Sequence, residues 1–137
     1  MTEYDDFVYK DGLLQSYKLY SINWKGTRNL KSFYSMRYDE EKRVKKFFIS
    51  DIERKQDRYS SKTYEELVPV GLYIYHYNQE NKIERIEFEE PSLISKSSQY
   101  FSIDYFEYDE NGNWVKEYFE NSHNEKHLMN SRTIIYR

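Results

Sequence analysis

A seven-residue pattern that recurs along the chain is the feature that most constrains its fold. Each copy begins with Tyr, continues through turn-forming residues and places an apolar or aromatic residue six positions later. The copies are Tyr38-Asp39-Glu40-Glu41-Lys42-Arg43-Val44, Tyr77-Asn78-Gln79-Glu80-Asn81-Lys82-Ile83 and Tyr108-Asp109-Glu110-Asn111-Gly112-Asn113-Trp114, with a shorter Tyr9-Lys10-Asp11-Gly12-Leu13 and an interrupted Ile135-Tyr136. Asp and Asn side chains bond nearby backbone groups in turns, and Gly adopts positive φ without strain. The pattern therefore predicts the tips of successive β-hairpins.

The segments between the tips are rich in Tyr, Phe and Ile, which favour strands. We expect an all-β, antiparallel meander of about four hairpins, with eight to nine strands, in a single domain over residues 1–137. Many twisted strands in one sheet must coil or close, so the sheet is expected to be strongly coiled or barrel-like. The predicted strands are 4–9, 13–22, 29–38, 43–50, 70–77, 82–89, 100–108, 113–121 and 131–137.

One segment between the second and third motif copies has helical features. Ser50-Asp51-Ile52-Glu53 has the form of a capping box, and Ile52, Gln56 and Tyr59 follow at helical spacing. The sequence therefore predicts one short helix within 51–68.

Pairing each motif Tyr with its apolar partner predicts how side chains divide between the two faces of the sheet. Counting outward from these pairs puts Phe, Ile, Leu and Val on one face, and Tyr, Trp, Met and charged residues on the other. A slip of one residue would exchange the two faces. The predicted pairs are Ile74 with Ile86, Tyr75 with Arg85, Tyr73 with Glu87, Ile103 with Phe119 and Phe33 with Ile49.

Two of the motif copies, 38–44 and 108–114, resemble the YD repeat of bacterial Rhs-type proteins. That repeat carries Tyr-Asp, two variable residues, Gly, a basic residue or Asn, and then an apolar residue. The last copy keeps the Gly, whereas Lys42 and Asn81 stand in its place in the other two. The resemblance implies a run of β-hairpins that curl into one coiled sheet, and it implies no catalytic residues.

No residue pattern in the sequence indicates catalysis, so we expect no enzyme activity, no catalytic residues, no metal and no cofactor. His123 and His127 have His-x-x-x-His spacing, but the Glu of a zinc-protease motif and a third ligand are missing. No phosphate-binding Gly loop or nucleophile elbow is present. The sequence also lacks an apolar run of 18 residues and a signal-peptide pattern, so we expect a cytoplasmic protein without a membrane partner.

Charge is distributed unevenly along the chain. Residues 70–125 hold 4 Lys/Arg against 12 Asp/Glu, whereas residues 1–69 hold 14 against 12. An acidic stretch either serves solubility or attracts a basic protein partner, and an acidic balance opposes nucleic-acid binding. Tyr and Trp are enriched where proteins meet, although such rings also cover the outside of twisted sheets. The predicted partner-binding residues are Tyr73, Tyr75, Glu87, Asp104, Tyr118 and Glu120.

These features favour a small, non-enzymatic protein-binding domain. One hypothesis is an immunity protein that neutralises a bacterial toxin, such as a nuclease, by occluding it through an acidic, Tyr-rich surface. The alternative is an exported surface module or a carbohydrate-binding module in which exposed Tyr and Trp stack on sugar rings. A purely structural repeat fragment, without a specific ligand, is the third hypothesis.

Overall fold

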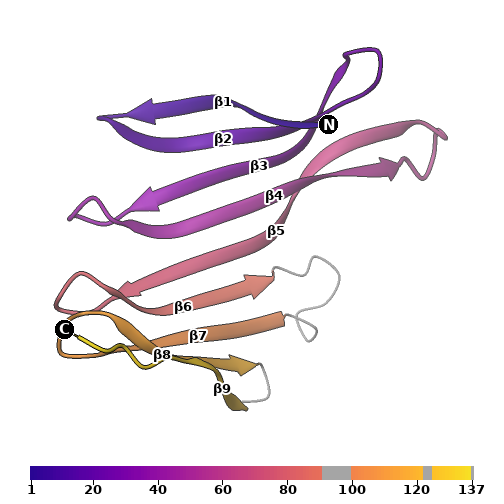
Figure 1. Ribbon diagram of the computed structural model, residues 1–137. Helices are drawn as coiled ribbons and strands as arrows, with labels where there is room; N and C mark the ends of the chain where they lie inside the picture. The colour runs from indigo at the N-terminus through magenta and orange to yellow at the C-terminus, as the bar shows by residue number, and fades with distance from the viewer. Residues whose placement is uncertain (91–99, 122–124, 137) are drawn as a thin grey trace. The chain divides into compact units, whose positions relative to one another are not determined.

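The chain folds as an antiparallel β-meander, as the repeated motif predicted. A computed structural model describes residues 1–90, 100–121 and 125–136, except the side chains of Tyr100 and Phe101. Nine strands follow one another in sequence order, each antiparallel to the next along the chain where the pairing is described (Figure 1). The strands are β1 (Thr2–Lys10), β2 (Leu13–Ile22), β3 (Arg28–Tyr38), β4 (Val44–Gln56), β5 (Thr63–Tyr77), β6 (Ile83–Glu90), β7 (Tyr100–Tyr108), β8 (Trp114–Asn121) and β9 (Lys126–Ser131).

The chain divides into two compact units, and the division falls within β5. Unit 1 comprises residues 1–71 and unit 2 comprises residues 72–137. Among the described residues, β1 pairs with β2 alone and β9 pairs with β8 alone, so the barrel-like closure is not observed. A strongly coiled sheet and a single domain over 1–137 stay predictions.

The predicted helix within 51–68 is wrong. β4 continues to Gln56 and β5 starts at Thr63, so this segment is the tip of a long hairpin. Ser50, the N-cap of the predicted capping box, instead pairs with Phe33 of β3, and the Asp51 Oδ1 accepts a hydrogen bond of 2.7 Å from the Ser32 hydroxyl on the same neighbouring strand. Cross-strand bonding therefore outweighs the local capping pattern. The described residues contain no helix, and thus none that is long and apolar enough to cross a membrane.

The last strand is shifted from its predicted position at 131–137. β9 ends at Ser131, and residues 132–136 continue beside β8 without forming a strand. The Arg132 N–H donates to the Val115 carbonyl at 2.9 Å, and the Tyr136 hydroxyl donates to Asp109 at the preceding hairpin tip. Side-chain bonds to a turn therefore hold this segment in place of a continued ladder.

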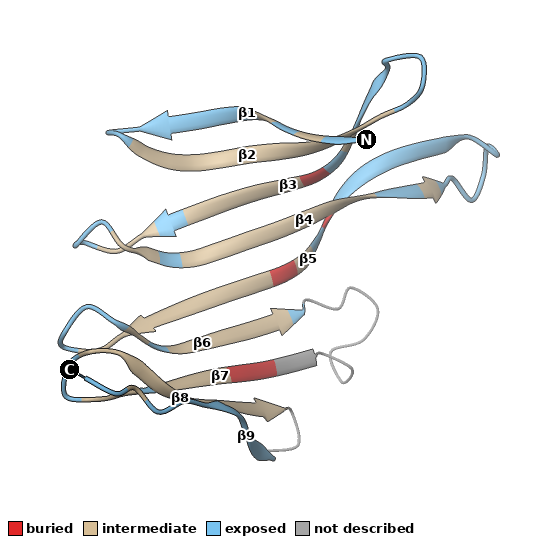
Figure 2. Ribbon diagram, in the orientation of Figure 1, coloured by how far each residue is buried: buried red, intermediate tan, exposed pale blue. Residues whose placement is uncertain are grey.

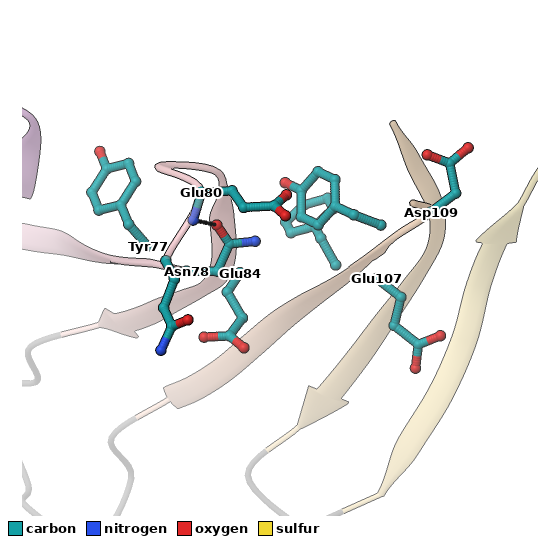
Figure 3. Close-up of a pocket in the computed structure, with 9 residues that line it drawn as sticks. Tyr77, Asn78, Glu80, Glu84, Glu107 and Asp109 are labelled. Carbon is teal, nitrogen blue, oxygen red and sulfur yellow. Dashed lines mark hydrogen bonds between the residues drawn. The ribbon is translucent and has the colours of Figure 1, made fainter. Parts of the chain in front are cut away.

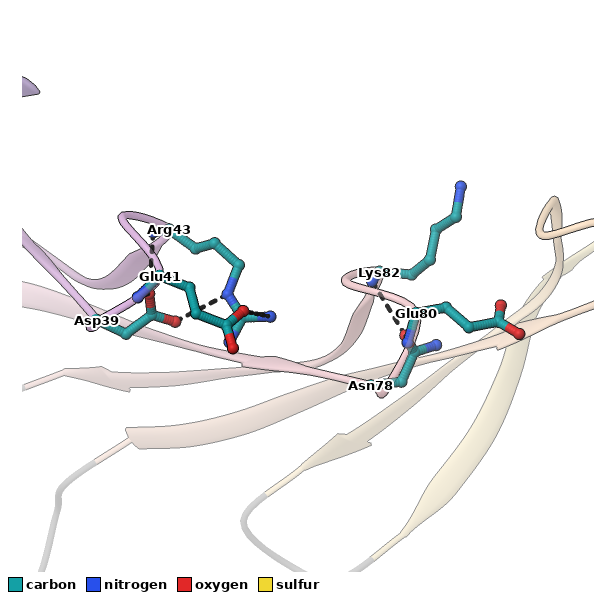
Figure 4. Close-up of polar contacts among 6 residues, drawn as sticks. All are labelled: Asp39, Glu41, Arg43, Asn78, Glu80 and Lys82. Atoms are coloured by element: carbon teal, nitrogen blue, oxygen red, sulfur yellow. Dashed lines mark hydrogen bonds and ion pairs between the residues drawn. The ribbon is translucent and has the colours of Figure 1, made fainter.

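The three full motif copies form turns with the same hydrogen bonds. In the first, the Asp39 carboxylate accepts the N–H groups of Glu41 (2.9 Å) and Arg43 (3.0 Å), and Lys42 has a φ of +63°. Asn78 and Asp109 make the equivalent two bonds in the other copies, where the residues with positive φ are Asn81 and Gly112. Figure 4 shows the Asp39 and Asn78 turns. The prediction of hairpin tips at these motifs is confirmed.

A fourth turn of this kind, between β2 and β3, was missed in the sequence. The Asn23 side chain accepts the N–H groups of Lys25 (2.9 Å) and Thr27 (3.0 Å), and Gly26 has a φ of +81°. The signal was present, because Asn followed three residues later by Gly is the spacing of Asp109 and Gly112. Ile22 rather than Tyr directly precedes Asn23, so this turn does not match the pattern that begins with Tyr.

A β-bulge follows each motif pair and makes the predicted face assignment wrong. Tyr77 pairs with Ile83 as predicted, but Glu84 has no opposite residue, and Tyr73 therefore faces Phe88. In the other two full copies the residue without an opposite partner in the strand pairing is Lys45 or Val115. The register is shifted by one residue in each copy. A bulge adds one residue to one strand and exchanges its faces from that point. The observed pairs are Tyr75 with Ile86, Ile74 with Glu87, Asp104 with Phe119, Ile103 with Glu120 and Tyr34 with Ile49.

The repeated Tyr has a structural role that ties one hairpin to the preceding one. The Tyr38 hydroxyl donates to the Leu14 carbonyl at 2.7 Å, and the Tyr108 hydroxyl donates to the Ile83 carbonyl. Leu14 and Ile83 are the residues paired with the motif Tyr of an earlier copy. Phe could not make this bond, which explains why the motif begins with Tyr.

Few side chains are buried (Figure 2). Among the described residues, the buried apolar side chains are Val68 and Ile103, at 7% and 8% exposure, and no side chain is fully enclosed. Within each unit the strands form a single layer (Figure 1). A sheet ordinarily buries an apolar face against a second layer, and the described residues of each unit do not supply one.

Candidate partner-binding surfaces

One face of unit 2 collects aromatic and aliphatic side chains and is named here the Tyr73 face. Its members are Tyr73, Tyr75, Ile86, Phe88, Asp104 and Phe119. Successive pairings place Tyr75, Ile86, Asp104 and Phe119 in one row across β5 to β8. The rings of Tyr73 and Phe88 lie 4.8 Å apart between centroids. Tyr75 is half-buried in this row, and its burial raises the pKa of its hydroxyl.

Asp104 is the charged residue among these six, and Glu117 lies on the same face of β8. Its cross-strand neighbours are the apolar side chains of Ile86 and Phe119. Burial, with a smaller contribution from the charge of Glu117, raises the pKa of the Asp104 carboxyl above its ordinary value. Within the part of the chain that the structure describes, Asp104 has no hydrogen-bond or ion-pair partner. A cation brought by a partner would supply the missing pair.

The opposite face of unit 2, named here the Glu87 face, has its charges already paired. Glu87 lies 3.3 Å from the Arg85 guanidinium and 3.4 Å from His76 Nε2. Glu120 accepts a hydrogen bond of 3.0 Å from the Tyr105 hydroxyl, whose pKa is raised by burial and by this bond. The Lys126 ammonium lies over the rings of Tyr105 and Tyr118, at 4.5 and 4.8 Å from their centroids. These acids therefore stabilise the sheet rather than await a cation.

The six predicted partner-binding residues are divided between these two faces. Tyr73, Tyr75 and Asp104 lie together on the Tyr73 face, as the rows across β5 to β8 show. The other three, Glu87, Tyr118 and Glu120, lie on the opposite face. The prediction that Tyr73 and Glu87 share a face is wrong, because the bulge at Glu84 shifts β6 by one residue.

An open groove of about 810 Å³ lies at the end of unit 2 that carries the motif turns (Figure 3). Acidic side chains line it from two hairpins, with Glu80 and Glu84 on one and Glu107 and Asp109 on the other. Tyr77, Asn78, Gln79, Phe106 and Tyr108 complete the lining, which contains no Lys or Arg. Hydrogen bonds from Tyr136 and from the backbone of Asn113 lower the pKa of Asp109, so this carboxylate is charged in the groove at neutral pH.

Unit 1 carries a different feature, a row of four stacked rings named here the aromatic ladder. Phe7, Tyr17, Tyr34 and Phe47 come from β1 to β4, with ring centroids 5.6, 4.8 and 5.8 Å apart and planes within 25° of parallel. The two central rings have a neighbour on each face, so the ladder presents ring edges outward. Sequence reasoning missed the ladder because it depends on the register of four strands, which the bulges set.

Several charges of unit 1 are paired between its strands. Arg28 lies 2.9 Å from Asp5 and 4.1 Å from the centroid of the Tyr20 ring. Lys55 lies 2.8 Å from Glu66, at the hairpin of β4 and β5. Unit 1 has 14 Lys/Arg and 12 Asp/Glu, whereas unit 2 has 7 and 12. The excess of negative charge therefore belongs to unit 2.

Comparison with known proteins identifies the fold and nothing more. No family model matches the sequence, and no curated protein matches it. A crystal structure of a protein of unknown function from Bacteroides fragilis NCTC 9343 is similar over 98% of this chain and 92% of that one, with a TM-score of 0.55 and 16% identity. A DUF3836 family protein from Parabacteroides distasonis ATCC 8503 aligns over 90% of this chain and 93% of that one, with a TM-score of 0.46 and 16% identity.

Proposed function

We propose that the chain is a non-enzymatic binding domain whose Tyr73 face docks on a basic protein. The observation that carries the proposal is Asp104, a partly desolvated carboxylate without a described partner in a row of Tyr, Ile and Phe side chains. Leaving such a charge unpaired costs free energy, which an Arg or Lys from a partner would recover. Large aromatic side chains around a central charged pair are typical of the residues that dominate protein interfaces.

A bacterial toxin such as a nuclease is the kind of partner that this chemistry suits. Enzymes that act on nucleic acids carry basic surfaces, because they bind phosphates. The net negative charge of unit 2 would speed capture of such a protein and orient it, while the apolar part of the Tyr73 face would hold it. In this proposal the chain is a cytoplasmic immunity protein that occludes its toxin.

The repeated turns support a second part of the proposal, that these hairpins are divergent copies of a YD-like repeat. Asp39, Asn78 and Asp109 accept the same two N–H groups, and Lys42 keeps positive φ without Gly. The aromatic ladder does not support a carbohydrate-binding role, because sugars stack on the faces of rings. In the aromatic ladder the faces of Tyr17 and Tyr34 are occupied by other rings.

The proposal is tested by capturing a partner at the Tyr73 face and then measuring its affinity. A photo-crosslinking residue at Tyr75 would capture the partner in cells, and calorimetry with the purified partner would follow. Tyr73→Ala and Asp104→Asn should each weaken binding by at least tenfold, because interface aromatics and desolvated charge pairs carry most of the affinity.

The matched control is Glu87→Gln, which changes an acid of unit 2 on the opposite face. It should leave the affinity within about twofold. Affinity lost in Glu87→Gln and kept in Asp104→Asn would contradict the assignment of the Tyr73 face. The immunity role requires in addition that the captured protein stops growth when expressed alone, and that co-expression of this chain restores growth.

A further inference from the structure

Two aromatic side chains of unit 1 are almost entirely in water. Trp24, in the β2–β3 turn, is 89% exposed, and Tyr59, in the β4–β5 turn, is 92% exposed. Trp is among the most buried residue types on average, so an exposed Trp at a hairpin tip indicates contact with something outside the chain. Both turns lie at the same end of unit 1, because each joins an even-numbered strand to the next (Figure 1).

These rings are presented by well-defined turns. Asn23 holds the first turn through its bonds to the backbone of Lys25 and Thr27. Asp57 holds the second, because one carboxylate oxygen accepts the Tyr59 N–H at 3.1 Å and the other accepts the Ser60 hydroxyl at 2.8 Å. The turns therefore fix where both aromatic side chains leave the sheet.

The same two turns are positively charged. Residues 23–27 contain Lys25 and no acid, and residues 57–62 contain Arg58 and Lys62 against Asp57. Both carboxylate oxygens of Asp57 are used within its turn, whereas Arg58 and Lys62 have no ion-pair partner among the described residues. The Lys25 ammonium lies 5.0 Å from the centroid of the Trp24 ring, so the cation and the ring form a cation–π pair.

We propose that these two turns, 23–27 and 57–62, form a pad that binds the surface of an anionic lipid membrane. Trp and Tyr prefer the membrane–water interface, where the ring is apolar and its polar atom stays wet, and Lys and Arg nearby are attracted to acidic headgroups. A membrane needs no complementary groove. Two hairpin tips are too small to bury the roughly 800 Å² per partner of a stable protein interface.

A contact of this kind requires no apolar segment long enough to cross the bilayer. The expectation of no membrane partner rested on the absence of such a segment. It therefore does not address contact of the exposed turns with the membrane surface. Other turns differ from the pad in ring content and charge, since residues 39–43 and 109–113 contain no aromatic residue and each carries a net negative charge. The pad is independent of the Tyr73 face, and either proposal can fail without the other.

The test is co-sedimentation of the full chain with vesicles of phosphatidylcholine alone and of phosphatidylcholine with 30% phosphatidylserine. Binding to the anionic vesicles should exceed binding to the neutral ones and should fall as salt rises. Lys25→Ala should lower the partition constant about fivefold, the effect of one basic residue near an anionic surface. Trp24→Ala and Tyr59→Ala should each lower it at least as much.

The second Trp provides a matched control and an optical probe. Trp114→Phe leaves Trp24 as the single Trp, so its emission should shift to the blue with anionic vesicles while the partition constant stays unchanged. Equal binding of Trp24→Ala and the unchanged chain, or no shift of Trp24 emission, would overturn the proposal. Trp24-dependent binding of a dT oligonucleotide, with no binding to vesicles, would overturn it in favour of a nucleic-acid site.

Discussion

Unit 1 and unit 2 use the same hairpin but place different chemistry on it. The Asp39 turn in unit 1 and the Asp109 turn in unit 2 share their hydrogen bonds, and a bulge follows each motif pair in both units. On this backbone, unit 1 stacks four rings on one another, whereas unit 2 sets Asp104 in a row of apolar side chains.

The difference shows that the repeat specifies the backbone and leaves the faces free to diverge. In unit 1 the rings stack on one another, which suits a stabilising role, and its two most exposed rings, Trp24 and Tyr59, are at the turns. In unit 2 a charge lacks a partner on one face, while the acids on the other face are paired. The stabilising ring stack and the proposed protein-binding face are therefore assigned to different units, and the proposed membrane-binding pad lies at the turns of unit 1.

The largest expected effect concerns the aromatic ladder. Tyr34→Ala should lower the free energy of unfolding by about 2 kcal/mol, because Tyr34 contacts the rings of Tyr4, Tyr17 and Phe47 and cross-strand aromatic pairs contribute up to about 1 kcal/mol each. Urea unfolding followed by circular dichroism measures the change. Tyr34→Phe is the control, because it keeps the stacking, and it should change stability by less than about 0.5 kcal/mol. Equal losses in both variants would show that stacking does not stabilise unit 1.

A smaller effect is expected at the turns, and it should be the same in both units. Asp39→Ala and Asn78→Ala should each cost about 1 kcal/mol, because each removes the acceptor of two backbone N–H groups in its turn. Asp39→Asn keeps the acceptor and should cost much less. The urea unfolding midpoints of the three variants test whether the Asp39 and Asn78 turns are equivalent. A loss of stability confined to one unit would contradict that equivalence.

Opposite substitutions at the turn residue with positive φ should change stability in opposite directions in the two units. Gly112→Ala should destabilise by about 1 kcal/mol, because φ is +79° and a Cβ is strained there. The added Cβ would lie 3.3 Å from the flexible end of the Lys82 side chain, so the backbone conformation decides the result. Lys42→Gly should stabilise by about 0.5 kcal/mol, because it relieves the same strain at a φ of +63°. Thermal unfolding of both variants measures the signs, and the same sign in both would contradict the equivalence of the turns.

The smallest effect is the pH dependence of stability, which should differ in sign between two Asp residues. Asp39 has a pKa held below its ordinary value of 3.8 by the Arg43 backbone N–H and side chain, so its contribution is present above that value and is lost as pH falls. Burial raises the pKa of Asp104, so its protonated form favours folding, and this contribution declines as pH rises through the raised pKa. Unfolding of Asp39→Asn and Asp104→Asn between pH 3 and pH 7 separates the two. Identical pH profiles in both variants would contradict these assignments.

Much of the fold could be predicted from the sequence, and the candidate site only in part. The first eight strands and the tips at Tyr38, Tyr77 and Tyr108 were predicted, because turn chemistry is local. The helix predicted around Ile52 failed because pairing with the neighbouring strand outweighed a local capping pattern. The bulges had no recognisable signal, because Lys45, Glu84 and Val115 share no side-chain chemistry.

The sequence by itself determined the turns at the three full motif copies, because an Asp or Asn that can accept backbone N–H groups follows each motif Tyr. Only the tertiary structure decided which side chains share a face, because strand side chains alternate with a period of two and one unpaired residue exchanges the faces. The single-residue shift at Glu84 places Glu87 on the face opposite Tyr73 and Tyr75, although the sequence predicted that they share a face.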